Sequence, residues 1–143
     1  MAKRKQPQVD SIAVPRSTGT SEHLPKPDVI VDFIFEDGLL YISIENIGER
    51  PAHKVSTKFN KAFHGVGGAQ EMPKLALFKN IAFLAPKKKI TTFLDTSTAY
   101  FSRKEPTDIT ATVFYLDEAG TAYKKIIGHD LKIYTDIGYV KRR

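Results

Sequence analysis

The 143-residue chain contains no cysteine, which excludes disulfide bonds, cysteine-bound metals and a cysteine nucleophile. It also lacks long hydrophobic runs. The apolar run Ile12–Val14 is far shorter than the core of a signal peptide, and no run approaches the ~18 residues of a membrane span. We therefore expect a cytoplasmic protein without a transmembrane segment. A cell-surface location is the alternative if the chain belongs to a longer one.

Net charge is also absent from most of the chain. Basic and acidic side chains balance in residues 27–138, so the net charge of +6 arises from residues 1–26 and 139–143. A neutral body with cationic ends does not fit a protein with a basic nucleic-acid groove. Weak, non-specific attraction to nucleic acid or an anionic surface would reside in the ends. The candidate anion-binding residues are Lys3, Arg4, Lys5, Lys141, Arg142 and Arg143.

The same boundaries divide the chain into an arm, one domain and a tail. Residues 1–26 contain three prolines and five serines or threonines without a periodic apolar pattern. Such a segment buries too little apolar surface to offset the entropy of ordering, so it is predicted to be a disordered basic arm. Residues 27–138 form the domain, and residues 139–143 are a basic tail.

Period-two alternation dominates the first half of the domain and predicts strands that are buried on one face. "VIVDFIFED" and "LLYISIEN" are joined by a Glu-Asp-Gly turn and read as a hairpin. "NIGERPA" then breaks the pattern with Gly48 and Pro51 and connects to a third strand, "HKVSTKF". The alternation in this third strand predicts that His53, Val55, Thr57 and Phe59 point inward.

The second half contains further strands and one long connection. "KKKITTFLD" and "ITATVFYLD" are predicted strands, the latter central because it is apolar on both faces. "DEAG" predicts a hairpin turn with Gly120 in the left-handed region, and the returning strand is predicted to bulge at Gly128. Residues 60–73 are predicted to be a loop, and residues 74–84 a short strand or helical turn. The pattern leaves open whether residues 60–84 form a binding loop or an extra strand pair.

These strands predict an all-β fold, an immunoglobulin-like antiparallel β-sandwich of about seven strands. The predicted core comprises Val31, Phe33, Leu40, Ile42, Ile44, Val55, Phe59, Leu94, Ile109, Val113, Tyr115 and Ile127.

Four turn and strand motifs carry a family resemblance: Pro27-Asp28 before a strand, Asn46-x-Gly48, Ala52, and Leu84-Ala85-Pro86. With "PDVIVDF", "ENIGERPAHKV", "LAPKKKITTFL" and "ITATVFYLDEAG", the chain resembles the bacterial cell-adhesion-related (CARDB-like) immunoglobulin-like domain. The resemblance implies a seven-stranded sandwich used for adhesion or assembly, and it implies no catalytic residues.

Catalytic and metal-binding patterns are scarce. "HGVGG" (residues 64–68) has neither the lysine of a phosphate-binding loop nor the glycine spacing of a dinucleotide fingerprint. The four histidines show no ligand spacing, and no Gly-x-Ser-x-Gly occurs. We therefore predict no catalytic residue, no metal and no cofactor, with a small hydrolase as a distant third reading.

Two loops, residues 60–73 and 97–106, are the candidate contact surface for a protein partner. Residues 64–68 form either a flexible connector or a binding loop, and "AYFSRKEP" interleaves aromatic and basic side chains. The simpler interpretation of the second loop is that its aromatics plug the end of the sandwich while its basic residues stay solvated. We predict a non-catalytic protein-interaction or assembly module, with a nucleic-acid or anionic-surface accessory protein as the alternative. The candidate partner-binding residues are His64, Gly65, Val66, Gly67, Gly68, Tyr100, Phe101, Arg103 and Lys104.

Overall fold

The alternating residues at the start of the domain form a hairpin. In the computed structural model, which describes residues 24–137, β1 (Val29–Glu36) pairs with β2 (Leu39–Asn46), with Val31 opposite Ile44. The strand β7 (Lys89–Thr96) pairs with the other edge of β2 and completes a three-stranded antiparallel sheet, β1-β2-β7. The apolar alternate residues of β1 and β2 thus share one buried face, as predicted.

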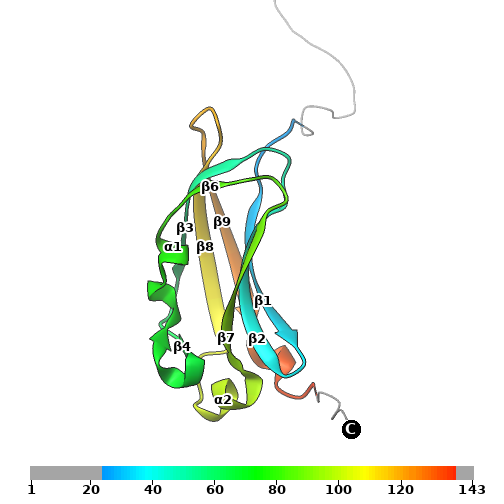
Figure 1. Ribbon diagram of the computed structural model, residues 1–143, viewed down its shortest axis with the longest axis vertical. Helices are drawn as coiled ribbons and strands as arrows, with labels where there is room; N and C mark the ends of the chain where they lie inside the picture. The colour runs from blue at the N-terminus through cyan, green and yellow to red at the C-terminus, as the bar shows by residue number, and fades with distance from the viewer. Residues whose placement is uncertain (1–23, 138–143) are drawn as a thin grey trace, which may run out of the picture.

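A second, four-stranded antiparallel sheet packs against the first (Figure 1). Its order is β6 (Ile81–Leu84), β3 (Ala52–Phe59), β8 (Asp108–Leu116) and β9 (Ala122–Asp130). The strand β8 is central, as its two apolar faces predict, and Gly120 turns the β8–β9 hairpin with φ 86°. The predicted antiparallel β-sandwich is confirmed.

Short elements fill the connections between the strands. The connection of residues 60–84 contains a small strand pair, β4 (His64–Gly65) with β5 (Gln70–Glu71), and the helix α1 (Ala76–Lys79). Short 3-10 turns occupy Val66–Gly68, Met72–Lys74 and Leu131–Tyr134, and the helix α2 spans Ser97–Ser102. Within residues 24–137, no helix is long and apolar enough to cross a membrane.

Most of the predicted core is buried, and the exceptions lie at its margin. Phe59 and Ile127 are only half-buried, whereas the other predicted core residues are buried. The core also takes side chains from connections and strand ends, whose burial no period-two pattern could indicate. These additional buried residues include Phe63, Met72, Phe78, Leu84, Tyr100 and Leu131.

Two local predictions are wrong. The strand β3 bulges at Lys54, which has φ 52°, and its register to β8 shifts between His53 and Ser56. The extra residue reverses the alternation, so Ala52 points inward and His53 lies on the outer face, 5.4 Å from the ring of Phe83. The predicted bulge at Gly128 does not occur, because the register of β8 with β9 continues without a shift through Thr110↔Gly128.

One side of the sandwich is sealed by side chains. At the free edge of β1, the Val31 carbonyl lies 3.0 Å from His129 Nε2. The Phe33 carbonyl accepts a hydrogen bond from the Tyr134 hydroxyl at 3.0 Å. An ion pair between Lys125 and Asp28 closes the same side. These contacts satisfy edge groups that could otherwise pair with another chain.

Asn46 joins the two sheets at one end of the sandwich. Its side-chain carbonyl accepts hydrogen bonds from the amides of Asp28 (3.1 Å) and Gly48 (2.9 Å). Its amide nitrogen donates to the carbonyls of Arg50 (2.8 Å) and Leu84 (3.1 Å). Asn46 is fully buried, and Leu84 belongs to the sheet opposite its own. A Cβ at neighbouring Gly48 would lie 2.3 Å from the Lys26 carbonyl, so the turn packs tightly on the incoming chain.

We expect Asn46→Ala to lower the free energy of unfolding by about 3–4 kcal/mol, because it leaves four backbone groups without partners in a buried site. Urea titration followed by circular dichroism measures the change. The matched control, exposed Asn80→Ala, should change stability by less than about 0.5 kcal/mol. An Asn46→Ala protein within about 1 kcal/mol of wild type would contradict this role.

Candidate functional site

A cluster of loops covers the end of the sandwich opposite the β8–β9 hairpin (Figure 1). The β4–β5 segment and α2 meet there, although 25 residues separate them in the sequence. The helix α2 begins at its N-cap Thr96, whose hydroxyl accepts a hydrogen bond from the Ala99 amide at 3.1 Å. After the helix, Lys104 takes a positive φ of 60° and turns the chain back toward β8.

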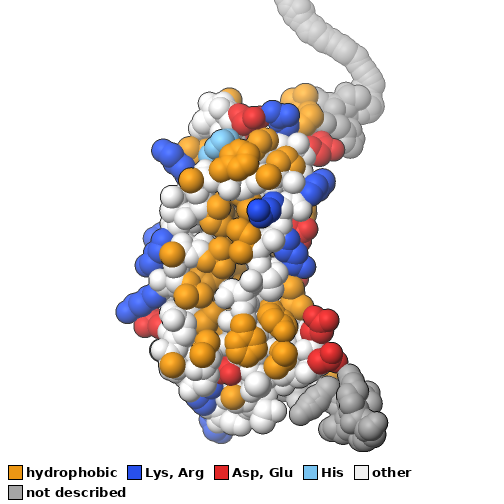
Figure 2. Space-filling model, viewed as in Figure 1, with side chains coloured by type: hydrophobic (Ala, Val, Ile, Leu, Met, Phe, Trp, Pro, Cys, Tyr) orange, Lys and Arg blue, Asp and Glu red, His pale blue; other side chains and the backbone are white. Residues whose placement is uncertain are grey.

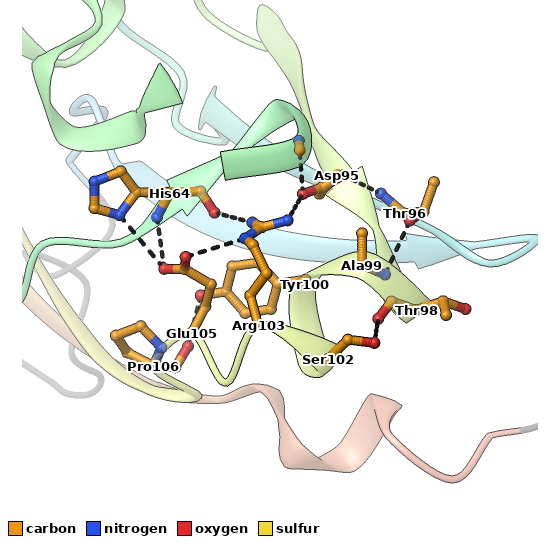
Figure 3. Close-up of polar contacts among 11 residues, drawn as sticks. His64, Asp95, Thr96, Thr98, Ala99, Tyr100, Ser102, Arg103, Glu105 and Pro106 are labelled. Atoms are coloured by element: carbon orange, nitrogen blue, oxygen red, sulfur yellow. Dashed lines mark hydrogen bonds and ion pairs between the residues drawn. The ribbon is translucent and has the colours of Figure 1, made fainter. Parts of the chain in front are cut away.

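The Arg103 side chain holds the two segments together (Figure 3). Its Nη1 forms an ion pair with Asp95 Oδ2 at 2.8 Å, and its Nε pairs with Glu105 Oε2 at 3.3 Å. Its Nη2 donates a hydrogen bond to the His64 carbonyl at 3.0 Å. The planar guanidinium can serve all three acceptors because its donors point in fixed, divergent directions.

The two carboxylates also bind the backbone of the β4–β5 segment. Glu105 Oε1 accepts a hydrogen bond from the His64 amide at 2.9 Å, and Asp95 Oδ2 accepts one from the Gly67 amide at 3.1 Å. Gly65 packs against β7 so closely that an added Cβ would lie 2.1 Å from the Leu94 carbonyl. The segment is therefore fastened at three successive points and is not a loose connector.

Burial and charge act in opposite directions on Arg103. Burial disfavours its charged form, but hydrogen bonds and charges from Asp95 and Glu105 outweigh this, so the pKa of Arg103 lies above its ordinary value. The Asp95 side chain is only 5% exposed, and Arg103 supplies its counter-charge away from water. Burial raises the pKa of Tyr100, whose hydroxyl donates to the Pro106 carbonyl at 2.6 Å.

The structure divides the predicted partner-binding residues into exposed and internal groups. His64 and Phe101 are half-buried, Lys104 is exposed, and Val66 is a hydrophobic side chain with 50% of its surface exposed at the tip of the segment. Tyr100 is fully buried, so its assignment as a partner-contacting residue is wrong; its ring is needed inside the fold. Gly65 packs inward, and the expectation that Arg103 stays solvated is also wrong because two ion pairs engage it.

The remaining predicted residues have different outcomes. Gly67 and Gly68 both have positive φ and shape the segment's tip. The terminal basic residues Lys3, Arg4, Lys5, Lys141, Arg142 and Arg143 lie outside the described residues. Asp95 and Glu105 were missed by sequence reasoning. The only available signal was the basic and acidic residues of "SRKE", which nothing in the sequence linked to Asp95 or to the backbone of His64.

The polar side chains of this cluster bind one another and the backbone. His64 Nδ1 lies 3.5 Å from Glu105 Oε1, but no hydroxyl or thiol nucleophile has a hydrogen bond to His64 among the described residues. The part of the chain from 24 to 137 also contains no group of three or more histidine, aspartate or glutamate side chains placed to hold a metal. The arrangement can present a rigid loop surface.

Arg103→Gln should lower the free energy of unfolding by about 2–3 kcal/mol, because it leaves the buried Asp95 carboxylate without its counter-charge. It should also speed hydrogen exchange at the amides of His64 and Gly67, whose acceptors lose their anchor. Exposed Lys104→Gln serves as the matched control and should change stability by less than about 0.5 kcal/mol. Unchanged exchange at His64 and Gly67 in the Arg103 variant would show that packing alone holds the segment.

Comparison with known proteins places the chain in a family without a known activity. No curated protein and no solved structure matches it. One family model matches residues 9–135, which is most of the chain. By that match, the chain belongs to the family described as "Domain of unknown function (DUF8453)".

Proposed function

We propose that this protein is a non-catalytic protein-interaction or assembly module on an immunoglobulin-like sandwich. The first, second and fifth long strands (β1, β2 and β7) form one sheet, and the third, sixth and seventh (β3, β8 and β9) lie together in the other. This distribution resembles the A-B-E and C-F-G sheets of immunoglobulin domains, with β6 paired to β3 as the additional strand. The arrangement supports the adhesion or assembly role that the CARDB-like resemblance implies, by analogy of fold.

The observation that carries the proposal is the fastened β4–β5 segment. Arg103, Asp95 and Glu105 hold its backbone, so Val66 is presented at the end of the sandwich with little freedom to lose on binding. Pre-organised loops on a rigid scaffold bind partners at a lower entropic cost than flexible ones. The contact surface proposed here comprises His64, Val66, Gly67, Phe101 and Lys104.

A photo-crosslinking amino acid placed at Val66 should capture a discrete partner in cells. The control position is Ala119, which is exposed on the β8–β9 hairpin at the opposite end. We expect a defined crosslinked band from position 66 and none from position 119. Arg103→Gln should reduce the yield at position 66, because it releases the segment. Equal crosslinking from both positions, or none from position 66, would reject this surface.

A second candidate function is charge-mediated binding to nucleic acid or an anionic surface. The specific observation is the charge distribution, because residues 27–138 are formally neutral and the net charge of +6 lies in the two ends. Each phosphate contact would release condensed counterion, giving a salt slope of roughly −0.9 per contact on duplex DNA. No base-reading element is proposed, so such binding would be independent of sequence.

A full-length variant with the six terminal basic residues changed to glutamine tests this candidate in a DNA titration at low and moderate salt. We expect affinity for duplex DNA to be lost in that variant. It should persist when Lys54, Lys58, Lys61, Lys79, Lys124 and Lys132 are changed instead. The reverse result would place binding on the sandwich, and absence of binding by the native chain would reject this function.

A further inference from the structure

The strand β3 is paired along only half of one edge. Its partner β6 pairs with residues Ala52 to Val55, and the preceding helix α1 lies beside the remainder. Between β3 and this helical connection lies a groove of about 330 Å³. The groove is lined by Ser56, Thr57, Lys58, Phe59, Pro73, Phe78 and Lys79.

Backbone groups of β3 point into this groove. The Asn60 amide donates to the Thr110 carbonyl at 3.0 Å, so Asn60 faces β8. Because an antiparallel ladder alternates its hydrogen-bonding residues, Lys58 also faces β8, whereas Thr57 and Phe59 face the opposite edge. The β6 ladder ends at Val55↔Ile81, and no loop hydrogen bond among the described residues reaches Thr57 or Phe59. Their amides and carbonyls are the free part of a strand edge.

The side chain of Thr57 also carries an unsatisfied polar atom. Its residue is 6% exposed, and its Oγ1 is the one buried side-chain polar atom in residues 24–137 without a hydrogen-bond partner. A buried hydroxyl without a hydrogen-bond partner lowers stability. A peptide bound in the groove that supplied this partner would remove that cost.

The walls and rim of the groove define the chemistry it would accept. The rings of Phe59 and Phe78 pack edge to face with their centroids 5.0 Å apart. Together with Pro73 they form an apolar wall. Lys58 and Lys79 are exposed on the rim, and the described structure gives neither an ion pair. No acidic side chain lines the groove. Figure 2 shows hydrophobic side chains down the middle of the face in view, with lysine and arginine side chains at the left margin, at the level of α1 in Figure 1.

We propose that this groove binds a short extended peptide with acidic side chains, which adds to β3 as a strand where β6 ends. The peptide backbone would pair with Thr57 and Phe59, and its alternate side chains would contact the Phe59–Phe78 wall or meet Lys58 and Lys79. The free edge of residues 56–59 accommodates roughly four peptide residues at about 3.3 Å each. This site lies apart from the proposed loop surface and does not depend on it.

The test uses the full chain and a fluorescent synthetic peptide of alternating glutamate and valine. Fluorescence anisotropy measures affinity, and ¹⁵N-labelled protein reports which amides respond. One control peptide replaces glutamate with lysine, and a second carries N-methyl groups that remove its backbone donors. The protein variant is Lys58→Glu with Lys79→Glu, and its matched control is Lys124→Glu with Lys132→Glu, two exposed lysines elsewhere.

We expect the acidic peptide to bind and to slow hydrogen exchange at the amides of Thr57 and Phe59. Affinity should fall about tenfold in the Lys58/Lys79 variant, remain unchanged in the Lys124/Lys132 variant, and be lost with either control peptide. Thr57→Val should raise the urea midpoint, because it removes the unpartnered hydroxyl, while weakening peptide binding about threefold. This opposite response separates a binding role from a structural one.

Three results would overturn the proposal. The first is no response at Thr57 and Phe59 with up to about 1 mM acidic peptide. The second is an equal loss of peptide affinity in the Lys58/Lys79 and Lys124/Lys132 variants, which would indicate attraction by overall charge alone. The third is undiminished binding of the N-methylated peptide, which would show that β3 is not the acceptor.

Discussion

The side-chain amide of Asn46 is the interaction on which the rest of the sandwich depends. It hydrogen-bonds the chain entering β1, the turn after β2 and the end of β6, so it connects elements of both sheets. Its backbone also pairs with Lys87 and Lys88, just before β7. A buried amide can replace water only if all its donors and acceptors find partners, which makes the relative position of these segments well defined. The broken alternation of "NIGERPA" is the sequence signature of this junction.

The opposite end is organised by charge. Arg103 compensates the charge of the buried Asp95 carboxylate. Asp95 and Glu105 in turn accept hydrogen bonds from the backbone of the β4–β5 segment. Removing charges from water is unfavourable, so such a network is stable only when every member is paired. A neutral amide therefore fixes the chain segments at one end, and an ion-pair network fixes them at the other.

The two sides of the sandwich differ in how their strand edges are treated. The edge of β1 is covered by His129 and Tyr134, whereas the second half of β3 keeps free backbone groups beside an apolar wall. Free edges invite association with other chains, and proteins usually cover them. The second half of β3 therefore stays open beside the groove, whereas the edge of β1 is closed by side chains.

The sequence by itself determined the six longest strands, most of their buried faces and the antiparallel sandwich, because period-two alternation and turn residues are local signals. Val31, Leu40, Ile42 and Val113 were predicted to be buried for this reason and are. The sequence could not reveal the bulge at Lys54, which places His53 on the outer face of the sheet, because a bulge depends on the pairing of two distant strands. Only the tertiary structure brought Arg103 to Asp95 and His64 and left the Thr57 hydroxyl without a hydrogen-bond partner. These contacts join residues far apart in the chain, so no local pattern encodes them, and they define both candidate binding surfaces.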